Sequence, residues 1–246
     1  MSIAIAVKNA KFENIAAVIF DKDGTLENSL AFWREVGTER ARMIDAQIPG
    51  VGEPLMMAFG ILDNTLDPQG LMAVGSRREN EIAAAAYIAE TGKSWYEARN
   101  IAQSAFTEVE RSKYLTKTAE SAPLFEDVKP TLNTLIDAGL KIGILSVDST
   151  VGVNTFVTNH QLQDSIHLCL GVDDNLSKPD PKLFLKACAS LGVLPEQTIM
   201  VGDTSNDMIM AKKAQAAATI GICRNQNTSI KSADVLINSL LEIQAL

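Results

Sequence analysis

Two kinds of hydrophobic pattern alternate along most of the chain. Residues 15–20 form a continuous apolar run with the length and the Ala, Val and Ile content of a strand buried on both faces. Shorter or similar runs recur at 140–145, 166–170, 198–201, 219–223 and 235–237. Apolar residues at helical spacing lie between them, at about 127–138, 151–160 and 206–214, in a helix ending at 191, and in a final helix that closes the chain. Strands that alternate with helices predict a parallel sheet covered on both faces.

A different pattern fills residues 27–120. Apolar residues recur there at helical spacing without a convincing strand, and Ser76–Glu79 and Ser94–Glu97 fit capping boxes at helix starts. The expected helices are 29–46, 55–62, 76–90 and 94–117. We therefore predict an α/β core, residues 1–26 and 121–246, as a doubly wound, Rossmann-like parallel sheet, interrupted once by an all-helical domain at 27–120. Residues 3–7 and the turn at 8–11 predict a short edge strand or hairpin.

Composition and charge narrow the classes of partner. The 246 residues are 46% hydrophobic, as in ordinary soluble globular proteins, and the formal net charge of −8 argues against a nucleic-acid surface or a polybasic membrane anchor. No apolar window is long enough for a membrane span. Cys169, Cys188 and Cys223 are odd in number, form no CxxC pair and lie in apolar contexts. We expect buried thiols, a reducing compartment and hence a cytoplasmic location.

Polar residues follow three of the predicted strands at the point where each strand ends. Asp21, Ser146 and Asp203 occupy these positions. Because the carboxyl ends of parallel strands meet at one edge of a sheet, we expect the three side chains to lie close together. Lys178 lies in a loop that we expect at the same edge of the sheet, where it can join these three side chains.

The carboxylates of this set indicate a metal, acid–base chemistry, or both. Asp21 and Asp23 are one residue apart and repel each other unless a cation separates them or one is protonated. Asp203 and Asp207 add two further carboxylates, and a set without His or Cys favours Mg²⁺ over zinc. Ser146 and Lys178 suit a phosphate, so phosphoryl transfer to a carboxylate is the natural chemistry. The alternative is an ordinary strand-end turn, a helix cap and a solvated lysine, which stands only if these positions do not converge.

The same positions resemble the four ordered motifs of the haloacid dehalogenase superfamily. They are Asp21-Lys22-Asp23-Gly24-Thr25-Leu26, Ser146, Lys178-Pro179 and Gly202-Asp203-x-x-x-Asp207. The likeness spans the α/β portion from end to end, and the helical insertion after the first motif resembles the α-helical cap of the family. By this resemblance the chain is similar to the phosphoglycolate phosphatases of the superfamily, whose substrates are small phosphorylated metabolites.

The resemblance implies a role for each motif residue. Asp21 would be the nucleophile that forms an aspartyl-phosphate, and Asp23 the acid and base. Mg²⁺ would be held by Asp21, Asp203 and the backbone carbonyl of Asp23, with Asp207 binding more distantly or orienting waters and Lys178. The transferring phosphoryl oxygens would be held by Ser146, Lys178 and the backbone N–H groups of Lys22, Asp23 and Val147.

Several positions bear on which reaction and which substrate contacts the resemblance implies. The second aspartate, Asp23, favours phosphate monoester hydrolysis or a phosphomutase, and a receiver-like, non-catalytic Mg²⁺-binding module is a further alternative. The segment after Ser146 lacks the Asn common in relatives. Arg77 and Arg78 could recognise a second anionic group of the substrate, although charges in the first turn of a helix are usually solvated. Other polar residues are expected to be structural: His160 and His167, which lack acidic partners in sequence, and a polar loop at Asp173 and Asp174.

Overall fold

The chain divides into two compact units. The computed structural model describes residues 3–172, 176–224 and 230–246, so Asp173 and Asp174 lie outside the described part. One unit comprises Met1–Asn28 and Leu124–Leu246, and the other comprises Ser29–Pro123. The assignment of 1–26 and 121–246 as a catalytic core and of 27–120 as a cap stays a prediction.

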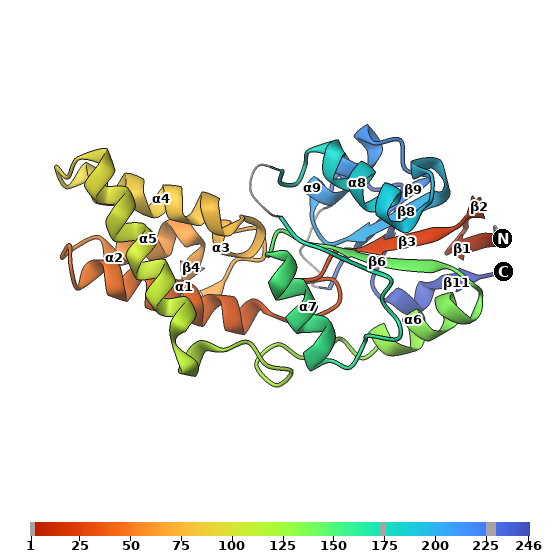
Figure 1. Ribbon diagram of the computed structural model, residues 1–246, viewed down its shortest axis with the longest axis horizontal. Coiled ribbons are helices and arrows are strands. Elements are labelled where there is room, and N and C mark those ends of the chain that lie inside the picture. The colour runs from red at the N-terminus through yellow and green to blue at the C-terminus, as the bar shows by residue number, and fades with distance from the viewer. Residues whose placement is uncertain (1–2, 173–175, 225–229) are drawn as a thin grey trace. The chain divides into compact units, whose positions relative to one another are not determined.

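The first unit is built on a six-stranded sheet in the order β10-β9-β8-β3-β6-β7, in which every pairing is parallel (Figure 1). Its strands are β3 (Ala17–Phe20), β6 (Lys141–Leu145), β7 (Leu168–Leu170), β8 (Thr198–Gly202), β9 (Ala218–Ile222) and β10 (Val235–Ile237). Its helices are α6 (Val128–Asp137), α7 (Thr150–Asn159), α8 (Pro181–Leu191) and α9 (Ser205–Lys213), with a 3₁₀ turn at Pro195–Gln197.

Helices cover both faces of this sheet because successive strand residues point to opposite sides. In β3, Phe20 belongs to a core cluster with Phe156 of α7 and residues of α6, whereas Ile19 belongs to a separate cluster with Phe184 of α8 and residues of α9. All four residues of β3 are buried, as the continuous apolar run predicts. The predicted doubly wound α/β fold is confirmed.

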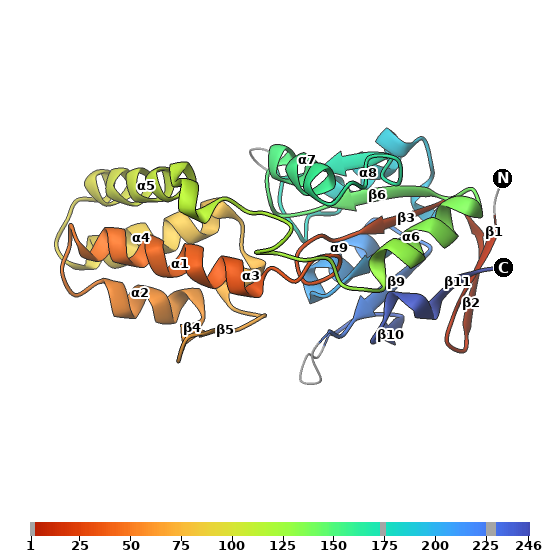
Figure 2. The same ribbon diagram turned by 90° about the horizontal axis from the view of Figure 1, so that it is seen from below.

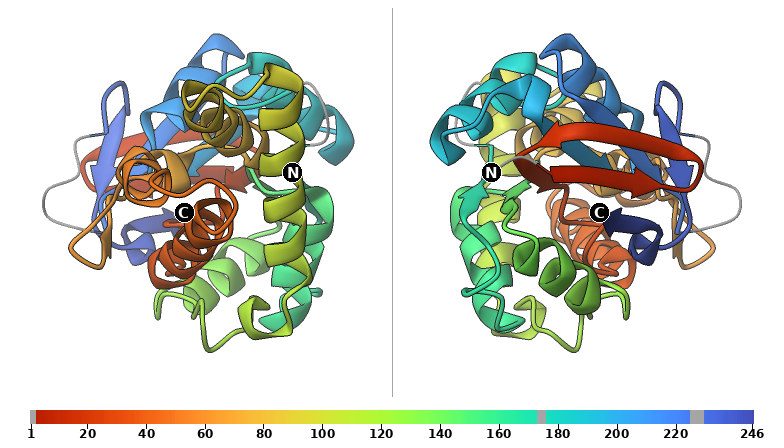
Figure 3. Two further views of the ribbon diagram at one scale, coloured as in Figure 1. Left: turned by 90° about the vertical axis from the view of Figure 1, so that its left-hand side faces the viewer. Right: turned by 90° about the vertical axis from the view of Figure 1, so that its right-hand side faces the viewer.

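A second, antiparallel sheet in the order β11-β1-β2 joins the two ends of the described chain (Figure 3, right). β1 (Ile3–Val7) and β2 (Ala10–Ile15) form the expected hairpin, and β11 (Ile243–Ala245) pairs with β1. The predicted final helix is therefore wrong. A single 3₁₀ turn, Leu240–Glu242, is followed by β11, because the backbone at Ile243 pairs with Val7 instead of continuing the helix.

The second unit is mostly helical (Figure 2). It has its own hydrophobic core. It contains α1 (Leu30–Asp45), α2 (Gly52–Phe59), α3 (Leu71–Val74), α4 (Arg77–Glu90), α5 (Trp95–Arg111) and a 3₁₀ turn at Lys113–Leu115. Both predicted capping boxes are present, with Ser76 and Ser94 as the caps.

The helical unit departs from the all-helical expectation at a short hairpin. β4 (Ile61–Leu62) pairs with β5 (Thr65–Leu66) across Asp63 and Asn64, which both have positive φ angles, 46° and 60°. Two consecutive positive φ angles at Asp and Asn are typical of the tight turn that closes a two-residue hairpin. The expected helix at 55–62 therefore ends earlier, at Phe59, and α5 ends at Arg111 rather than near 117.

The burial of the cysteines tests the expectation made for their thiols. Cys188 is buried, but Cys169 and Cys223 are partly exposed, so the expectation of three buried thiols is wrong for two of them. Among the residues that the structure describes, none of the helices combines the length and apolar character needed to cross a membrane.

Candidate active site

Asp21 lies at the carboxyl end of the central strand β3. Its backbone N–H donates to the carbonyl of Val201 at 2.8 Å, which extends the parallel pairing with β8 by one residue. The chain then turns sharply, because the carbonyl of Lys22 accepts from the N–H groups of Leu26 at 2.9 Å and Glu27 at 3.1 Å. The side chain of Asp21 is 8% exposed, so the strand and the turn together fix a buried carboxylate at the sheet edge.

Asp203 and Asp207 follow β8, the neighbour of β3. Asp207 lies in the first turn of α9, where Thr204 is the cap: the Asp207 carboxylate accepts from the Thr204 N–H at 3.2 Å and from its hydroxyl at 2.5 Å. This capping box satisfies backbone donors at the helix start and orients the fully buried Asp207. Asp203 precedes the cap and accepts a hydrogen bond from the hydroxyl of Thr25 at 3.3 Å.

Lys178 joins these carboxylates across the sheet edge. Its ammonium contacts Oδ1 of Asp21 directly and lies 2.6 Å from Oδ1 of Asp207. The Lys178 side chain is 4% exposed, so the positive charge is held inside the site rather than in solvent. The structure thus brings together residues that are far apart in the sequence, from three of the four motifs.

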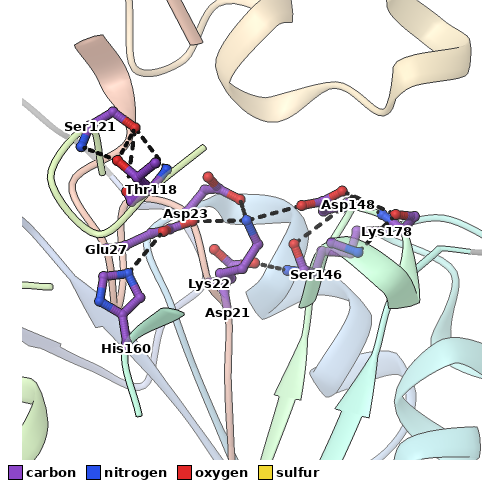
Figure 4. Close-up of polar contacts among 12 residues, drawn as sticks. Asp21, Lys22, Asp23, Glu27, Thr118, Ser121, Ser146, Asp148, His160 and Lys178 are labelled. Carbon is purple, nitrogen blue, oxygen red and sulfur yellow. Dashed lines mark hydrogen bonds and ion pairs between the residues drawn. The ribbon is translucent and has the colours of Figure 1, made fainter. Parts of the chain in front are cut away.

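Ser146 directly follows β6, the other neighbour of β3. Its N–H donates to the carbonyl of Leu170 at 3.0 Å, and its hydroxyl oxygen accepts from the N–H of Asp148 at 3.1 Å. Ser146 is fully buried (Figure 4). Val147 follows it in the sequence. Since β3, β6 and β8 are parallel neighbours, Ser146, Asp21 and Asp203 are brought to the same edge of the sheet, as expected.

Burial and mutual repulsion shape the titration of the carboxylates. Burial raises the pKa of the Asp21 carboxyl to about 6 against the opposing effect of the Lys178 ammonium, and Asp207 and Asp23 add to the rise. Burial, followed by the charges of Asp21 and Asp207, raises the pKa of Asp203 well above its ordinary value. In Lys178, burial works to lower the pKa, but Asp207 and Asp21 outweigh it and the pKa rises, so this group is an ammonium.

The three aspartates have the donor chemistry of a Mg²⁺ site. One carboxylate oxygen each from Asp21, Asp203 and Asp207 lies within 4.8 Å of the other two. Lys178 supplies one positive charge to three carboxylates, which leaves negative charge that a divalent cation would neutralise. The residues present therefore fit the expected ion, with oxygen-only donors.

The side chain of Lys22 forms a second charged cluster that the sequence did not reveal. It is fully buried, and its ammonium lies 2.6 Å from Oδ2 of Asp23, 2.9 Å from Oε1 of Glu27 and 3.2 Å from Oδ2 of Asp148 (Figure 4). Burial works to lower the pKa of Lys22, but the charges of Asp23, Glu27 and Asp148 outweigh it and raise the pKa well above its ordinary value. The only signal in the sequence is a charged residue between two aspartates at the end of an apolar strand.

His160 belongs to the same neighbourhood. The expected structural role of His160 stays a prediction, although its Nε2 lies 3.8 Å from Oε2 of an acidic partner, Glu27. The partner is 133 positions away in the chain and could not be found from local sequence. His167 accepts a hydrogen bond from the N–H of Ile142 at 3.1 Å through Nδ1, in agreement with a structural role.

Arg77 and Arg78 belong to the helical unit and lie at the start of α4. Arg77 is paired with Glu81 at 2.5 Å and with Glu110 at 2.6 Å. Both arginines are exposed. Recognition of substrate by these two residues stays a prediction.

The structure is that of an α/β protein with a cluster of aspartates at the carboxyl ends of neighbouring parallel strands. A family model described as haloacid dehalogenase-like hydrolase matches residues 15–215. The chain therefore belongs to the haloacid dehalogenase-like hydrolases. This match covers the motifs that carry the resemblance seen in the sequence.

Individual relatives agree with this assignment. A phosphoglycolate phosphatase from Yersinia pestis is 30% identical over 88% of this chain and 84% of the relative. A crystal structure of a HAD phosphatase from Thermococcus onnurineus has a TM-score of 0.61 at 23% identity, over 93% of this chain and 95% of that chain. A β-phosphoglucomutase candidate from Thermotoga maritima has a TM-score of 0.60 at 17% identity, over 93% and 96%. The structural likenesses establish the fold, and the family match and relatives confirm the expected class of enzyme, a phosphoric monoester hydrolase.

Proposed function

We propose that this protein is a Mg²⁺-dependent phosphatase that hydrolyses a small phosphorylated metabolite through an aspartyl-phosphate. One observation carries the proposal: a buried lysine, Lys178, contacts Asp21 and Asp207 at the edge of the sheet where Asp203 also lies. Such a site combines a nucleophile with the positive charge that a phosphoryl group needs. The similarity to a phosphoglycolate phosphatase supports this reaction.

In the proposed first step, Asp21 attacks phosphorus. A carboxylate oxygen of Asp21 forms the new bond to phosphorus as the bond to the leaving oxygen breaks, and Asp23 gives that oxygen a proton. In the second step, Asp23 takes a proton from water, whose oxygen attacks phosphorus and releases Asp21 and inorganic phosphate. One residue thus acts as acid and then as base, which returns the enzyme to its starting state.

The remaining residues would hold the phosphoryl group. The Ser146 hydroxyl, the Lys178 ammonium and the backbone N–H groups of Lys22 and Val147 would bind its oxygens and stabilise charge in the transition state. Mg²⁺, held by Asp21, Asp203 and Asp207 and by the backbone carbonyl of Asp23, would neutralise charge on the carboxylates and the phosphoryl oxygens. Asp207 also positions Lys178 through the contact at 2.6 Å.

The substrate class follows from the relatives more than from the site. A phosphoglycolate-like or sugar phosphate ester is the proposed substrate, and a cytoplasmic location agrees with such a metabolite. Arg77 and Arg78 are proposed contacts for a second anionic group. A panel of phosphoglycolate, sugar phosphates and nucleotides, compared by kcat/KM, would identify the preferred ester.

Turnover of p-nitrophenyl phosphate tests the reaction. We expect steady release of phosphate that requires Mg²⁺ and is abolished by EDTA. Asp21→Asn should lower kcat by roughly 10⁴-fold or more while circular dichroism stays unchanged, because the nucleophile is lost without a change in side-chain volume. Asp137→Asn, at an exposed aspartate of α6, is the matched control and should retain full activity.

Two outcomes would contradict the proposal. Wild-type activity in Asp21→Asn would remove Asp21 from the reaction. A single burst of phosphorylation without turnover would favour a receiver-like module. A phosphomutase, the remaining alternative, would hydrolyse its phospho-enzyme slowly in water and accelerate with a sugar bisphosphate; the fold shared with the Thermotoga maritima protein does not by itself favour it.

A further inference from the structure

Two carboxylates other than that of Asp23 hold the ammonium of Lys22: those of Glu27 and Asp148. Glu27 lies on the far side of the motif turn, and Asp148 lies in the loop after β6 (Figure 4). Their carboxylate oxygens are 2.9 Å and 3.2 Å from Lys22 Nζ. The ammonium therefore has two carboxylate partners besides the third, Asp23, which lies 2.6 Å away.

Both clamping carboxylates are themselves held in place. Glu27 is 1% exposed and lies beside His160, whose ring packs on Phe156 with centroids 4.9 Å apart. Asp148 accepts a hydrogen bond from the N–H of Ser149 at 2.7 Å, and its own N–H donates to the Ser146 hydroxyl at 3.1 Å. The buried ammonium is therefore part of a connected set of polar contacts that reaches the motif loops at Asp23 and Ser146.

The side chain of Lys22 has no assigned part in the reaction proposed above, in which only its backbone N–H contacts the phosphoryl group. A lysine loses substantial rotamer freedom when it is fixed, and an ammonium is costly to bury without partners. Here three carboxylates offset the free-energy cost of fixing and burying the ammonium. One of them, Asp23, is the proposed acid and base. Preorganised charges of this kind are what orient a reacting side chain.

We propose that Lys22 is a positioning residue: its ammonium, clamped by Glu27 and Asp148, orients the Asp23 carboxyl group for proton transfer to the leaving oxygen. The inference rests on the proposed function, because it takes Asp23 as the acid. In this step the O–H bond of Asp23 breaks, its proton goes to the leaving oxygen, and the bond between phosphorus and that oxygen breaks. Lys22 keeps all its protons throughout, and its side chain acts through its contact with the Asp23 carboxyl group rather than on the substrate.

The dependence on the leaving group separates positioning from a general structural role. An alkoxide must be protonated as it leaves, whereas p-nitrophenolate leaves readily without a proton. Since kcat/KM reports only steps up to loss of the first product, hydrolysis of the aspartyl-phosphate does not enter it. The measured quantity is therefore kcat/KM for an alkyl phosphate divided by kcat/KM for p-nitrophenyl phosphate.

Lys22→Met should lower this ratio. We expect kcat/KM for the alkyl ester to fall roughly 10- to 100-fold and that for the aryl ester to fall less than about 5-fold, because general acid catalysis contributes about 10²–10⁴-fold and a misoriented acid loses part of it. Lys22→Arg, which keeps the charge, should restore part of the ratio. Lys212→Met removes a half-exposed lysine that pairs with Asp234 at 2.6 Å and should leave the ratio unchanged.

Lys22→Met leaves three carboxylates without their cation, so a second variant controls for misfolding. Lys22→Met combined with Glu27→Gln removes one negative charge together with the positive one and should show the same lowered ratio. Asp148→Asn keeps Lys22 but loosens the clamp, so we expect a smaller fall in the ratio. Thermal unfolding of every variant identifies those that fold.

The outcomes distinguish this inference from the proposed function. If wild-type protein hydrolyses neither ester, the proposed function fails. If the wild type is active but folded Lys22 variants lose activity equally on both esters, or lose none, the positioning role is overturned. A rise in the ratio would also overturn it, since Lys22 would then restrain Asp23 rather than orient it.

Discussion

At the scale of single residues, the site depends on backbone geometry that few residue types allow. Gly24 has a φ angle of +76°, in the left-handed region that favours glycine. A Cβ built at this position would lie 2.2 Å from Oδ2 of Asp203. Glycine is therefore needed at position 24 for two reasons: the turn that follows Asp21 has a positive φ angle, and Asp203 approaches too closely for a Cβ.

Gly24→Ala should displace Asp203 and weaken metal binding. We expect the affinity for Mg²⁺, measured by the metal dependence of kcat, to fall roughly 10- to 100-fold. The unfolding free energy should fall by about 1–2 kcal/mol from the strained φ angle. Gly92→Ala is the matched control: its φ angle is +95°, but a Cβ there would have no neighbour within 4 Å. It should cost stability without changing the Mg²⁺ dependence; an equal effect of both substitutions on Mg²⁺ would contradict the steric explanation.

At the scale of elements, a buried ion pair ties the C-terminal segment to the first motif. Arg224, just after β9, donates to both carboxylate oxygens of Asp127 at 2.7 Å and 3.0 Å and to the carbonyl of Thr25 at 2.7 Å. Asp127, at the start of α6, also accepts from the Ser239 hydroxyl and the Leu240 N–H, each at 2.8 Å. One carboxylate therefore holds α6, the C-terminal 3₁₀ turn and, through Arg224, the motif turn.

Asp127→Ala should destabilise the protein by about 2–4 kcal/mol, because it leaves a largely buried guanidinium without its partner. Burial opposes ionisation of Asp127, but Arg224, Leu240 and Ser239 outweigh it and lower the pKa. The stabilisation is thus present above the ordinary carboxyl pKa and is lost as the pH falls through the lowered one. Urea unfolding of wild type and variant from about pH 7 to about pH 3 should show the difference shrinking toward acid.

The control for this experiment is a surface pair. Lys11 and Glu13 lie 2.9 Å apart, with side chains 55% and 75% exposed. Lys11→Ala should change the unfolding free energy by less than about 1 kcal/mol. An effect of Asp127→Ala no larger than this would show that the buried pair does not hold these elements together.

At the scale of the whole molecule, each compact unit has its own hydrophobic core. Phe106 of α5 is fully buried among side chains of the helical unit, and Phe184 of α8 is fully buried against one face of the six-stranded sheet. No residue is common to these two clusters. Separate cores predict units that can unfold separately.

Phe106→Ala and Phe184→Ala should each cost about 3–5 kcal/mol, but in different units. Hydrogen exchange followed by mass spectrometry should show lost protection in α1, α4 and α5 for the first variant. For the second variant, the loss should fall in β6, β8 and α8. Equal loss of protection across both units in either variant would show that the protein unfolds as one cooperative body.

Elements set by local sequence were predicted well. The buried strand at β3, the capping boxes of α4 and α5 and the alternation of strands with helices depend on residues a few positions apart. The last strand, β11, was mistaken for a helix because its partner β1 lies at the other end of the chain. The β4–β5 hairpin and α3 are too short for periodicity to distinguish them.

The order of the motifs, and the sheet edge at which Asp21, Ser146 and Asp203 meet, could be predicted from the residue pattern alone, since parallel strands bring their carboxyl ends together. The residue pattern also indicated an oxygen-donor metal site and a phosphate-binding lysine. Only the tertiary structure decided which charges are buried together, because burial depends on contacts between residues distant in the chain. In the folded chain, Lys178 pairs with Asp21 and Asp207. Lys22, which stands between the two aspartates of the first motif, pairs with Asp23, Glu27 and Asp148.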